Sequence, residues 1–371
     1  MSNKKPVVVY GASGYTGRLI AESLRNYDIP FIAAGRNAER VAEAMKLVPG
    51  IETADYEIVE VEHTVEALAE LFKGTKVICN TVGPFHYFGE TVVEAAAIAN
   101  VHYLDTTGEI FFMNKVKNKF SDNFKANGKV LAPCTSYMYV PLEIAARVAL
   151  ETPGIDSLEA VCYAAGTPTY GSTQSIFSMF QAADDAFFIQ NNERVIWPKA
   201  KGYEVMVPGE TMTQLTHCWG GGSLPLFFES DARVRNCRQL TGFTNRELME
   251  QVIAMQNMYE NDIKPLSAEE QSVQLKAIGE SIQPGMPPRE NPLVHRCVDF
   301  VKGRGGNNTS GCTVRSFTPY LLTGVVQAAT ANFLLNGHQL ESGFVSACQA
   351  VGYQELMGQL QNFGLIEVEI D

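Results

Sequence analysis

Three glycines spaced three residues apart, Gly11, Gly14 and Gly17, follow an apolar stretch at residues 7–10. A helix-patterned stretch begins directly after them, at residues 18–24. The first glycine allows a sharp turn, the second lets the backbone approach a pyrophosphate, and the third lets a helix pack closely on a strand. The helix N-terminus adds N–H groups and a positive dipole end. Rather than an ordinary glycine turn, we expect a dinucleotide-binding loop, whose predicted cofactor contacts are Gly11, Ser13, Gly14, Tyr15, Thr16 and Gly17.

The residues after the second apolar stretch, 30–34, bear on the choice of nucleotide. An NAD site usually has an acid there, about 20 residues past the glycines, which binds the ribose hydroxyls. This sequence has Gly35, Arg36 and Asn37 instead. An arginine can bind a 2′-phosphate through charge-assisted hydrogen bonds. We therefore expect NADP, with Arg36 and Asn37 in the site; the alternative is that Arg36 is a solvated residue at a helix start.

A hydride-transfer enzyme also needs a proton source in a dry pocket. The candidates are His86, Glu109 and Tyr137, which all follow expected strands. A tyrosine, with a pKa near 10, can donate a proton if its pocket lowers that pKa. Each candidate also has an ordinary explanation, as a loop histidine, as an acid favoured in the first turn of a helix, or as a packing tyrosine. Further cofactor contacts are expected at Val82, Gly83, Pro84 and Thr107.

Strand-like and helix-like stretches alternate with short links through the first 133 residues. This alternation predicts an α/β fold with a parallel, doubly wound Rossmann sheet and right-handed crossovers. Ligands bind outside the carboxyl ends of such strands, where the candidate residues above also lie. The expected strands are residues 7–10, 30–34, 57–61, 76–81, 102–105 and 129–133.

The pattern changes near residue 150, which suggests three parts. We expect an NADP-binding domain at residues 1–145, an α+β substrate or dimerisation domain at 146–318, and C-terminal helices at 319–371 that pack back on the first domain. In the second part, a helix is expected from residue 170 towards 190, and a glycine-rich run at 303–308 is expected to be a hairpin turn. The strands expected there are residues 158–164, 201–207, 226–228, 295–302 and 311–317.

The composition limits the class of protein. A formal net charge of −12 argues against a nucleic-acid or anionic-membrane surface. The eight cysteines form no C-x-x-C pair, and we expect reduced, mostly buried thiols in a cytoplasmic protein without a signal peptide or a metal site. Residues 316–340 carry no Asp, Glu, Lys or Arg, but they are too polar to span a membrane. We expect a buried or subunit-interface helix there, and hence a homodimer.

With these motifs in view, the chain resembles the saccharopine dehydrogenase-like oxidoreductases and is most similar to the branch that includes trans-acting enoyl reductases. One departure lies after the sixth expected strand, where the family usually carries a Gly-Phe-Asp-x-x-Pro-like segment. Here residues 135–141 read TSYMYVP, which keep Pro141 but not the Phe-Asp pair. The residues that carry the resemblance are Gly83, Pro84, Phe85, Tyr87, Gly89, Tyr103, Asp105, Gly108, Glu109 and the run Gly171-Ser172-Thr173.

The resemblance implies the fold and NADP use, but the family includes both C–N and C=C chemistry. Our leading expectation is an NADPH-dependent enzyme that reduces an activated, enoyl-type C=C bond of a small-molecule substrate. The first alternative is an imine- or amine-directed dehydrogenase. Such an enzyme needs a residue that binds the substrate carboxylate, for which Arg233, Arg235 and Arg315 are candidates. The second alternative is a catalytically inactive NADP-binding scaffold.

Overall fold

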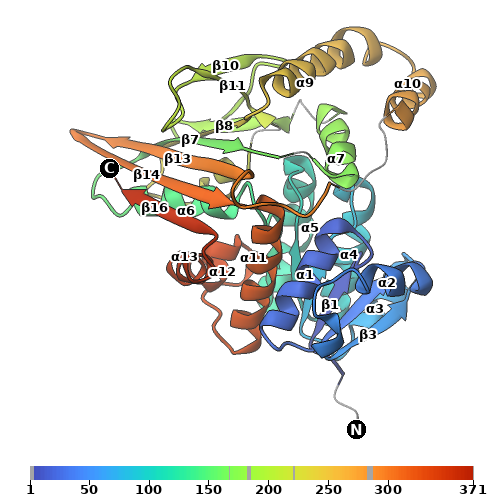
Figure 1. Cartoon of the computed structure of the whole chain (residues 1–371). Coiled ribbons are helices and arrows are strands. Elements are labelled where there is room, and N and C mark those ends of the chain that lie inside the picture. Colours follow the sequence, from blue (N-terminus) through green and yellow to red (C-terminus); the bar gives the residue numbers. More distant parts are fainter. Residues whose placement is uncertain (1–3, 167, 182–184, 220–221, 282–286, 371) are drawn as a thin grey trace. The chain divides into compact units, whose positions relative to one another are not determined.

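The computed structural model describes residues 4–166, 168–181, 185–219, 222–281 and 287–370 (Figure 1). The chain divides into two compact units, and each is described by itself. Unit 1 comprises Met1–Thr107, Phe112–Ile144 and Thr318–Ile366. Unit 2 comprises Gly108–Phe111, Ala145–Phe317 and Glu367–Asp371.

Unit 1 is built on a seven-stranded sheet with the order β15-β6-β5-β4-β1-β2-β3. All neighbouring strands are parallel. The central strands are buried along their whole length, as expected when helices cover both faces of a sheet. This confirms the α/β class and the parallel Rossmann-type sheet. The strands are β1 (Val7–Tyr10), β2 (Phe31–Gly35), β3 (Tyr56–Glu60), β4 (Val77–Asn80), β5 (His102–Asp105), β6 (Val130–Ala132) and β15 (Gly343–Phe344).

Helices connect these strands and return from the C-terminus. Right-handed crossovers place the helices that follow β1 and β2 on one face of the sheet and those that follow β3 and β4 on the other. Figure 1 shows α1 and α11 side by side, although they are far apart in the sequence. The helices are α1 (Tyr15–Asn26), α2 (Ala38–Met45), α3 (Val65–Phe72), α4 (Phe85–Ala99), α5 (Ile110–Ala126), α6 (Val140–Ala149), α11 (Pro319–Leu335), α12 (Ala347–Val351) and α13 (Tyr353–Asn362).

Helix α11 is the uncharged segment of the sequence, and it packs on α1 of its own unit. A Cβ on Gly324 would stand 2.6 Å from the backbone O of Leu19, so the two helices approach each other without an intervening side chain. Tyr320 packs edge-to-face on Tyr15, with 5.2 Å between ring centroids. The apolar surface of α11 is therefore used within unit 1, and its composition does not require a second subunit. The homodimer stays a prediction.

Unit 2 contains a mixed nine-stranded sheet. Its main path runs β10-β11-β12-β7-β13-β14-β16, with β8 paired to β12 and β9 to β8. Residues Gly306 and Asn307 connect β13 to β14, which confirms the expected hairpin turn. The elements are β7 (Ser157–Ala164), α7 (Tyr170–Gln181), β8 (Phe187–Gln190), β9 (Glu193–Ile196), β10 (Gly202–Val205), β11 (Gln214–His217), α8 (Leu224–Phe228), β12 (Asn236–Phe243), α9 (Arg246–Met258), α10 (Ala268–Ser281), β13 (Arg296–Gly305), β14 (Asn308–Phe317) and β16 (Ile366–Ile370).

Two expected elements of unit 2 are wrong. Residues 226–228 belong to helix α8, not to a strand; a short apolar run does not distinguish the two, and Pro225 in its first turn favours a helix start. The helix that begins at Tyr170 ends at Gln181, and residues 187–190 form β8 instead. The sequence of β8, FFIQ, has the aromatic and β-branched residues that favour strands.

Three findings concern the described residues of both units. All eight cysteines are free thiols and are buried. Within the described ranges, no helix is long and apolar enough to cross a membrane. Over the same ranges, no group of three or more His, Cys, Asp or Glu residues is placed to hold a metal ion.

The close approach of α1 and α11 gives a test of the fold. We expect Gly324→Ala to lower the free energy of unfolding by roughly 1–3 kcal/mol, because its Cβ overlaps the Leu19 carbonyl. Gly358→Ala in α13 is the matched control, since a Cβ there meets nothing within 4 Å and alanine favours a helix by up to about 1 kcal/mol. Urea unfolding followed by circular dichroism measures both. Equal midpoints for the two variants would contradict the close packing.

A buried histidine in each unit gives a second test. Burial lowers the pKa of His102, at the start of β5, to about 4, helped by Lys129 and Lys76, and the pKa of His217 in unit 2 to about 4. An unfolded histidine has a pKa near 6.5, so between about pH 6.5 and 4 the unfolded chain binds more protons than the folded one. Stability must therefore fall as the pH drops through this window, by roughly 3 kcal/mol for each histidine.

The variant that tests this is His102→Gln. It removes one group from the pH dependence, so the urea midpoint of unit 1 should change less between about pH 7 and pH 5 than in the wild type. If the wild type and the variant lose stability in parallel over this range, His102 is not buried in its neutral form.

Candidate functional site

The loop between β1 and α1 has the backbone geometry of a pyrophosphate site. Gly11 has a φ of +90°, which favours glycine, and Gly14 N donates to Gly11 O at 2.9 Å. A Cβ on Gly17 would stand 2.4 Å from Gly11 O. The sharp turn and the close packing of α1 on the loop therefore both depend on glycine, as the spacing predicts.

The N-terminus of α1 is suited to a phosphate. Its N-cap residue, Gly14, has no side chain that could accept hydrogen bonds from the first-turn N–H groups, so these groups can donate to a ligand oxygen. Ser13 and Thr16 lie half-buried in the same loop and turn. The ring of Tyr15 packs on Tyr320 of α11 and so supports the helix. These features fit the pyrophosphate of a dinucleotide.

The end of β2 carries the predicted selectivity residue. Arg36 is exposed, and in the described part of the chain it makes no ion pair. Asn37, a predicted cofactor contact, caps α2 by accepting from Arg40 N at 2.7 Å. The acid at the end of β3, Glu60, accepts from Ala38 N at 2.8 Å. The nearby carboxylate of Glu60 is thus bonded to the backbone of α2. The binding of a 2′-phosphate by Arg36 stays a prediction.

Sequence reasoning missed His63, which follows β3. Its Nδ1 lies 2.8 Å from the hydroxyl of Tyr10, and the two rings are stacked with centroids 6.0 Å apart. Burial, and then the charge of Arg36, lower the pKa of His63, so the imidazole is neutral near pH 7. Burial raises the pKa of Tyr10 to about 12, against the opposing effect of Arg36. The place of His63 at the carboxyl end of a parallel strand is the signal that could have identified it.

The end of β4 is tied to the glycine loop. The hydroxyl of Thr81 donates to the backbone O of Tyr10 at 3.1 Å. Asn80 Oδ1 accepts from Val82 N at 3.0 Å, while its Nδ2 donates to the hydroxyl of Tyr103 at 2.9 Å. The predicted contacts Val82, Gly83 and Pro84 follow as half-buried residues that lead into α4.

Asp105 holds the ends of β5 and β6 together. Its fully buried carboxylate accepts from the hydroxyl of Tyr103 at 2.9 Å, from Thr107 N at 2.9 Å and from Cys134 N at 3.0 Å. Because three donors satisfy it, this buried charge supports the loops instead of facing a substrate. The predicted cofactor contact Thr107 is itself fully buried.

The loop after β6 is held by α11. Gln327 Nε2 donates to the backbone O of Asp105 at 2.9 Å and to that of Thr135 at 2.8 Å. Thr323 Oγ1 accepts from Tyr137 N at 3.0 Å. Two C-terminal side chains therefore fix the backbone of the loop that was predicted to carry the proton donor.

The three predicted catalytic residues lie in different surroundings. Tyr137 is 8% exposed, in the loop fixed by α11. His86 is an exposed residue in the first turn of α4; partial burial and then Lys115 lower its pKa. Glu109 is fully buried and belongs to a segment that groups with unit 2. Their catalytic roles stay predictions.

Two family models match successive parts of the chain. The boundary between them lies between residues 131 and 141, close to the change in sequence pattern near residue 150. Residues 7–131 match the model described as "Saccharopine dehydrogenase NADP binding domain", which supports NADP as the cofactor. Residues 141–370 match the model described as "Family of unknown function (DUF5938)".

All of the following relatives share only part of this chain, and some of them are named as oxidoreductases or reductases. The "Probable mitochondrial saccharopine dehydrogenase-like oxidoreductase" of Arabidopsis thaliana is 29% identical over 149 residues, 37% of this chain and 33% of that protein. The "Lipid droplet localized protein" of Caenorhabditis elegans is 29% identical over 146 residues, 37% of this chain and 34% of that protein. The "Trans-acting enoyl reductase" of Mycobacterium tuberculosis is 34% identical over 112 residues, 29% and 26% of the two chains.

The first two of these matches span about a third of the length of each relative. Among solved structures, apo saccharopine dehydrogenase (L-Glu forming) from Saccharomyces cerevisiae is similar over 99% of this chain and 100% of that one. The TM-score is 0.60 at 12% sequence identity, which is a likeness of fold. Residues 7–131 thus match an NADP-binding domain that is described for saccharopine dehydrogenase, and several relatives that share this part are named oxidoreductases. Because its model covers more than half of the sequence, the chain belongs to the family described as "Family of unknown function (DUF5938)".

Proposed function

We propose that the chain is an NADPH-dependent oxidoreductase that reduces an activated C=C bond of a small molecule. The proposed use of NADPH rests mainly on Arg36, which is exposed at the end of β2. The glycine loop between β1 and α1, whose geometry fits a pyrophosphate, supports it. The similarity to the trans-acting enoyl reductase supports the C=C part. We also propose a cytoplasmic location, whereas two relatives are named for lipid droplets and for mitochondria.

When bound, NADPH supplies the hydride. In this proposal the β1–α1 loop binds the pyrophosphate and Arg36 binds the 2′-phosphate. The loop after β6 presents Tyr137 as the proton donor, with its backbone fixed by Thr323 and Gln327.

The C–N alternative requires an arginine that can bind a substrate carboxylate. Two of the three candidate arginines are already bonded to acids. Arg233 donates to Asp231 at 2.7 Å, and Arg315 donates to Glu369 at 3.1 Å. A carboxylate substrate would have to compete with these acids. Arg235 is exposed and remains a candidate for this role. The inactive-scaffold alternative rests on the altered loop at residues 135–141.

The cofactor proposal predicts a selective loss in one variant. Arg36→Ala should weaken NADPH binding by about 1.5–3 kcal/mol, the range for a charged hydrogen bond, and should leave NADH binding almost unchanged. Lys46→Ala is the control, because it removes a positive charge from an exposed position at the other end of α2. Fluorescence titration with both nucleotides measures the effect. Equal losses for NADPH and NADH, or no binding of either by the wild type, would contradict the assignment.

The reaction proposal predicts which substrates consume NADPH. We expect oxidation of NADPH with an α,β-unsaturated thioester, and none with a 2-oxo acid plus an amino acid. Tyr137→Phe should lower kcat by about 10²–10⁴-fold, the usual contribution of general acid catalysis, with no change in NADPH affinity. Turnover only with the oxo acid and amine would favour the C–N alternative. NADPH binding without any turnover would favour the scaffold.

A further inference from the structure

Three titratable side chains form a cluster at the carboxyl edge of the sheet in unit 1. Tyr10, Arg36 and His63 end or follow β1, β2 and β3, which are neighbouring strands. The hydroxyl of Tyr10 lies 2.8 Å from His63 Nδ1, and the two rings are stacked. The charge of Arg36 adds to the effect of burial on the pKa of His63 and opposes the larger effect of burial on that of Tyr10. His63 therefore responds to the charge at the position of Arg36.

His63 can take up a proton without losing its neighbours. A tyrosine hydroxyl can donate or accept, so Tyr10 can pair with Nδ1 of the neutral and of the protonated imidazole. On the other side of the ring, Nε2 is buried, and the backbone of Phe88 favours the charged form. Burial is the larger effect against protonation, and the charge of Arg36 is the second. A ligand that reverses the charge near Arg36 would thus favour the imidazolium.

Other titratable groups on the elements next to His63 have to be considered. Glu60 is already bonded to Ala38 N at 2.8 Å, and Glu62 is exposed. Of these charged groups, Arg36 is the one that shifts the pKa of His63. The groups are Tyr10 on β1, Arg36 after β2, Glu60 and Glu62 at the end of β3, and His86 and Tyr87 in the first turn of α4.

A 2′-phosphate next to Arg36 would reverse the sign of this charge. A phosphate monoester carries about −1.5 to −2 near pH 7, which exceeds the single positive charge of the guanidinium. The net charge close to His63 then becomes negative, and a nearby opposite charge stabilises a protonated histidine. NADH has no phosphate at this position, so it leaves the charge of Arg36 uncompensated.

We propose that His63 is a second determinant of NADPH selectivity, which takes up a proton from solvent when the 2′-phosphate binds beside Arg36 and then attracts that phosphate. Because Tyr10 and Phe88 occupy the two sides of the ring, His63 acts through its charge and not through a hydrogen bond to the ligand. This proposal rests on the proposed binding of NADPH at Arg36. The opposing explanation is that His63 only packs between Tyr10 and Phe88.

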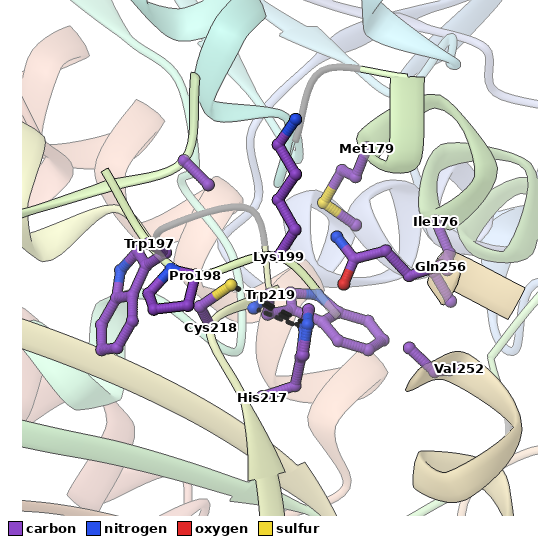
Figure 2. A pocket seen from close by; sticks show the side chains of 11 residues that line it. Ile176, Met179, Trp197, Pro198, Lys199, His217, Cys218, Trp219, Val252 and Gln256 are labelled. Carbon is purple, nitrogen blue, oxygen red and sulfur yellow. Dashed lines mark hydrogen bonds between the residues drawn. The ribbon is translucent and has the colours of Figure 1, made fainter. Parts of the chain in front are cut away.

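His217 of unit 2 provides an internal reference. It lies among packed side chains that include Trp219 and Gln256 (Figure 2). Its Nδ1 accepts from Trp219 N at 3.1 Å, and burial lowers its pKa to about 4. None of the residues proposed for the 2′-phosphate belongs to unit 2. His217 should therefore stay neutral between about pH 5.5 and 8.5, and a titration near the ordinary value of about 6.5 would reveal unfolding.

Histidine side-chain NMR of the full chain tests the proton uptake directly. The signal of His63 is assigned by its loss in His63→Gln. In the free chain and with NADH bound, the midpoint of its titration should lie below the ordinary value of about 6.5. With NADPH bound, the midpoint should rise by about one unit or more, the size of shift that a close opposite charge causes.

Nucleotide binding at several pH values tests the selectivity. In the wild type, the preference for NADPH over NADH should grow by about 3- to 10-fold from pH 8.5 to 6.5, since one pKa unit corresponds to tenfold. His63→Gln should lose this growth and keep the preference that Arg36 provides. The control is His338→Gln, at a partly exposed histidine of unit 1 that bonds to Val351 O. The phosphate itself titrates near about pH 6, but it does so equally in all three proteins.

The outcomes separate this proposal from the cofactor assignment. Suppose that NADPH binds selectively through Arg36, but the midpoint of His63 is the same with both nucleotides, or His63→Gln keeps the full pH dependence. The role of His63 is then wrong, and the cofactor assignment stands. If neither nucleotide binds to the wild type, both are wrong. A pH dependence lost equally in His338→Gln would also contradict the role of His63.

Discussion

Unit 1 depends on two places where the backbone of α1 touches another backbone without an intervening side chain. At its first turn, Gly17 lies against the carbonyl of Gly11, and in its middle the carbonyl of Leu19 lies against Gly324 of α11. The first contact shapes the loop that can hold a pyrophosphate. The second brings the C-terminal helix onto the same face of the sheet. A side chain at either glycine would separate elements that have to be in contact for the site to exist.

The second contact explains how distant residues shape the site. Gln327 bonds to the backbone of Asp105 and Thr135, which are 222 and 192 residues away in the sequence. These bonds lie at the ends of β5 and β6, where the buried carboxylate of Asp105 also gathers three donors. The strand ends are thus fixed from both sides, by a charge inside the sheet and by an amide on α11. Preorganisation of this kind is what a catalytic loop requires.

The sequence predicts most of unit 1, because long apolar runs and glycine spacing are local signals. It does not predict β15, whose two residues, Gly343 and Phe344, are too short for any pattern. The helix at residues 319–335 is correctly expected to be buried, but its partner α1 is not evident, because apolar composition is the same for an intramolecular and a subunit contact. His63 is missed for a similar reason: only the sheet brings it beside Tyr10 and Arg36. Of the candidate site, the glycine loop and Arg36 were accessible from the sequence, and the network around Asp105 was not.

Left-handed backbone at residues other than glycine gathers near the end of β6. Nine described residues other than glycine have positive φ, and four of them are Asn or Asp, which tolerate this conformation. The other five are Cys134, Met138, Ala200, Trp219 and Thr318. The first two lie in the loop after β6, and Thr318 is the N-cap of the helix that fixes that loop. Ala200 and Trp219 belong to unit 2. Each such residue costs about 1–3 kcal/mol and persists only where its surroundings impose it. Three of the five therefore lie in or next to the loop after β6, whose backbone Gln327 and Thr323 hold in place.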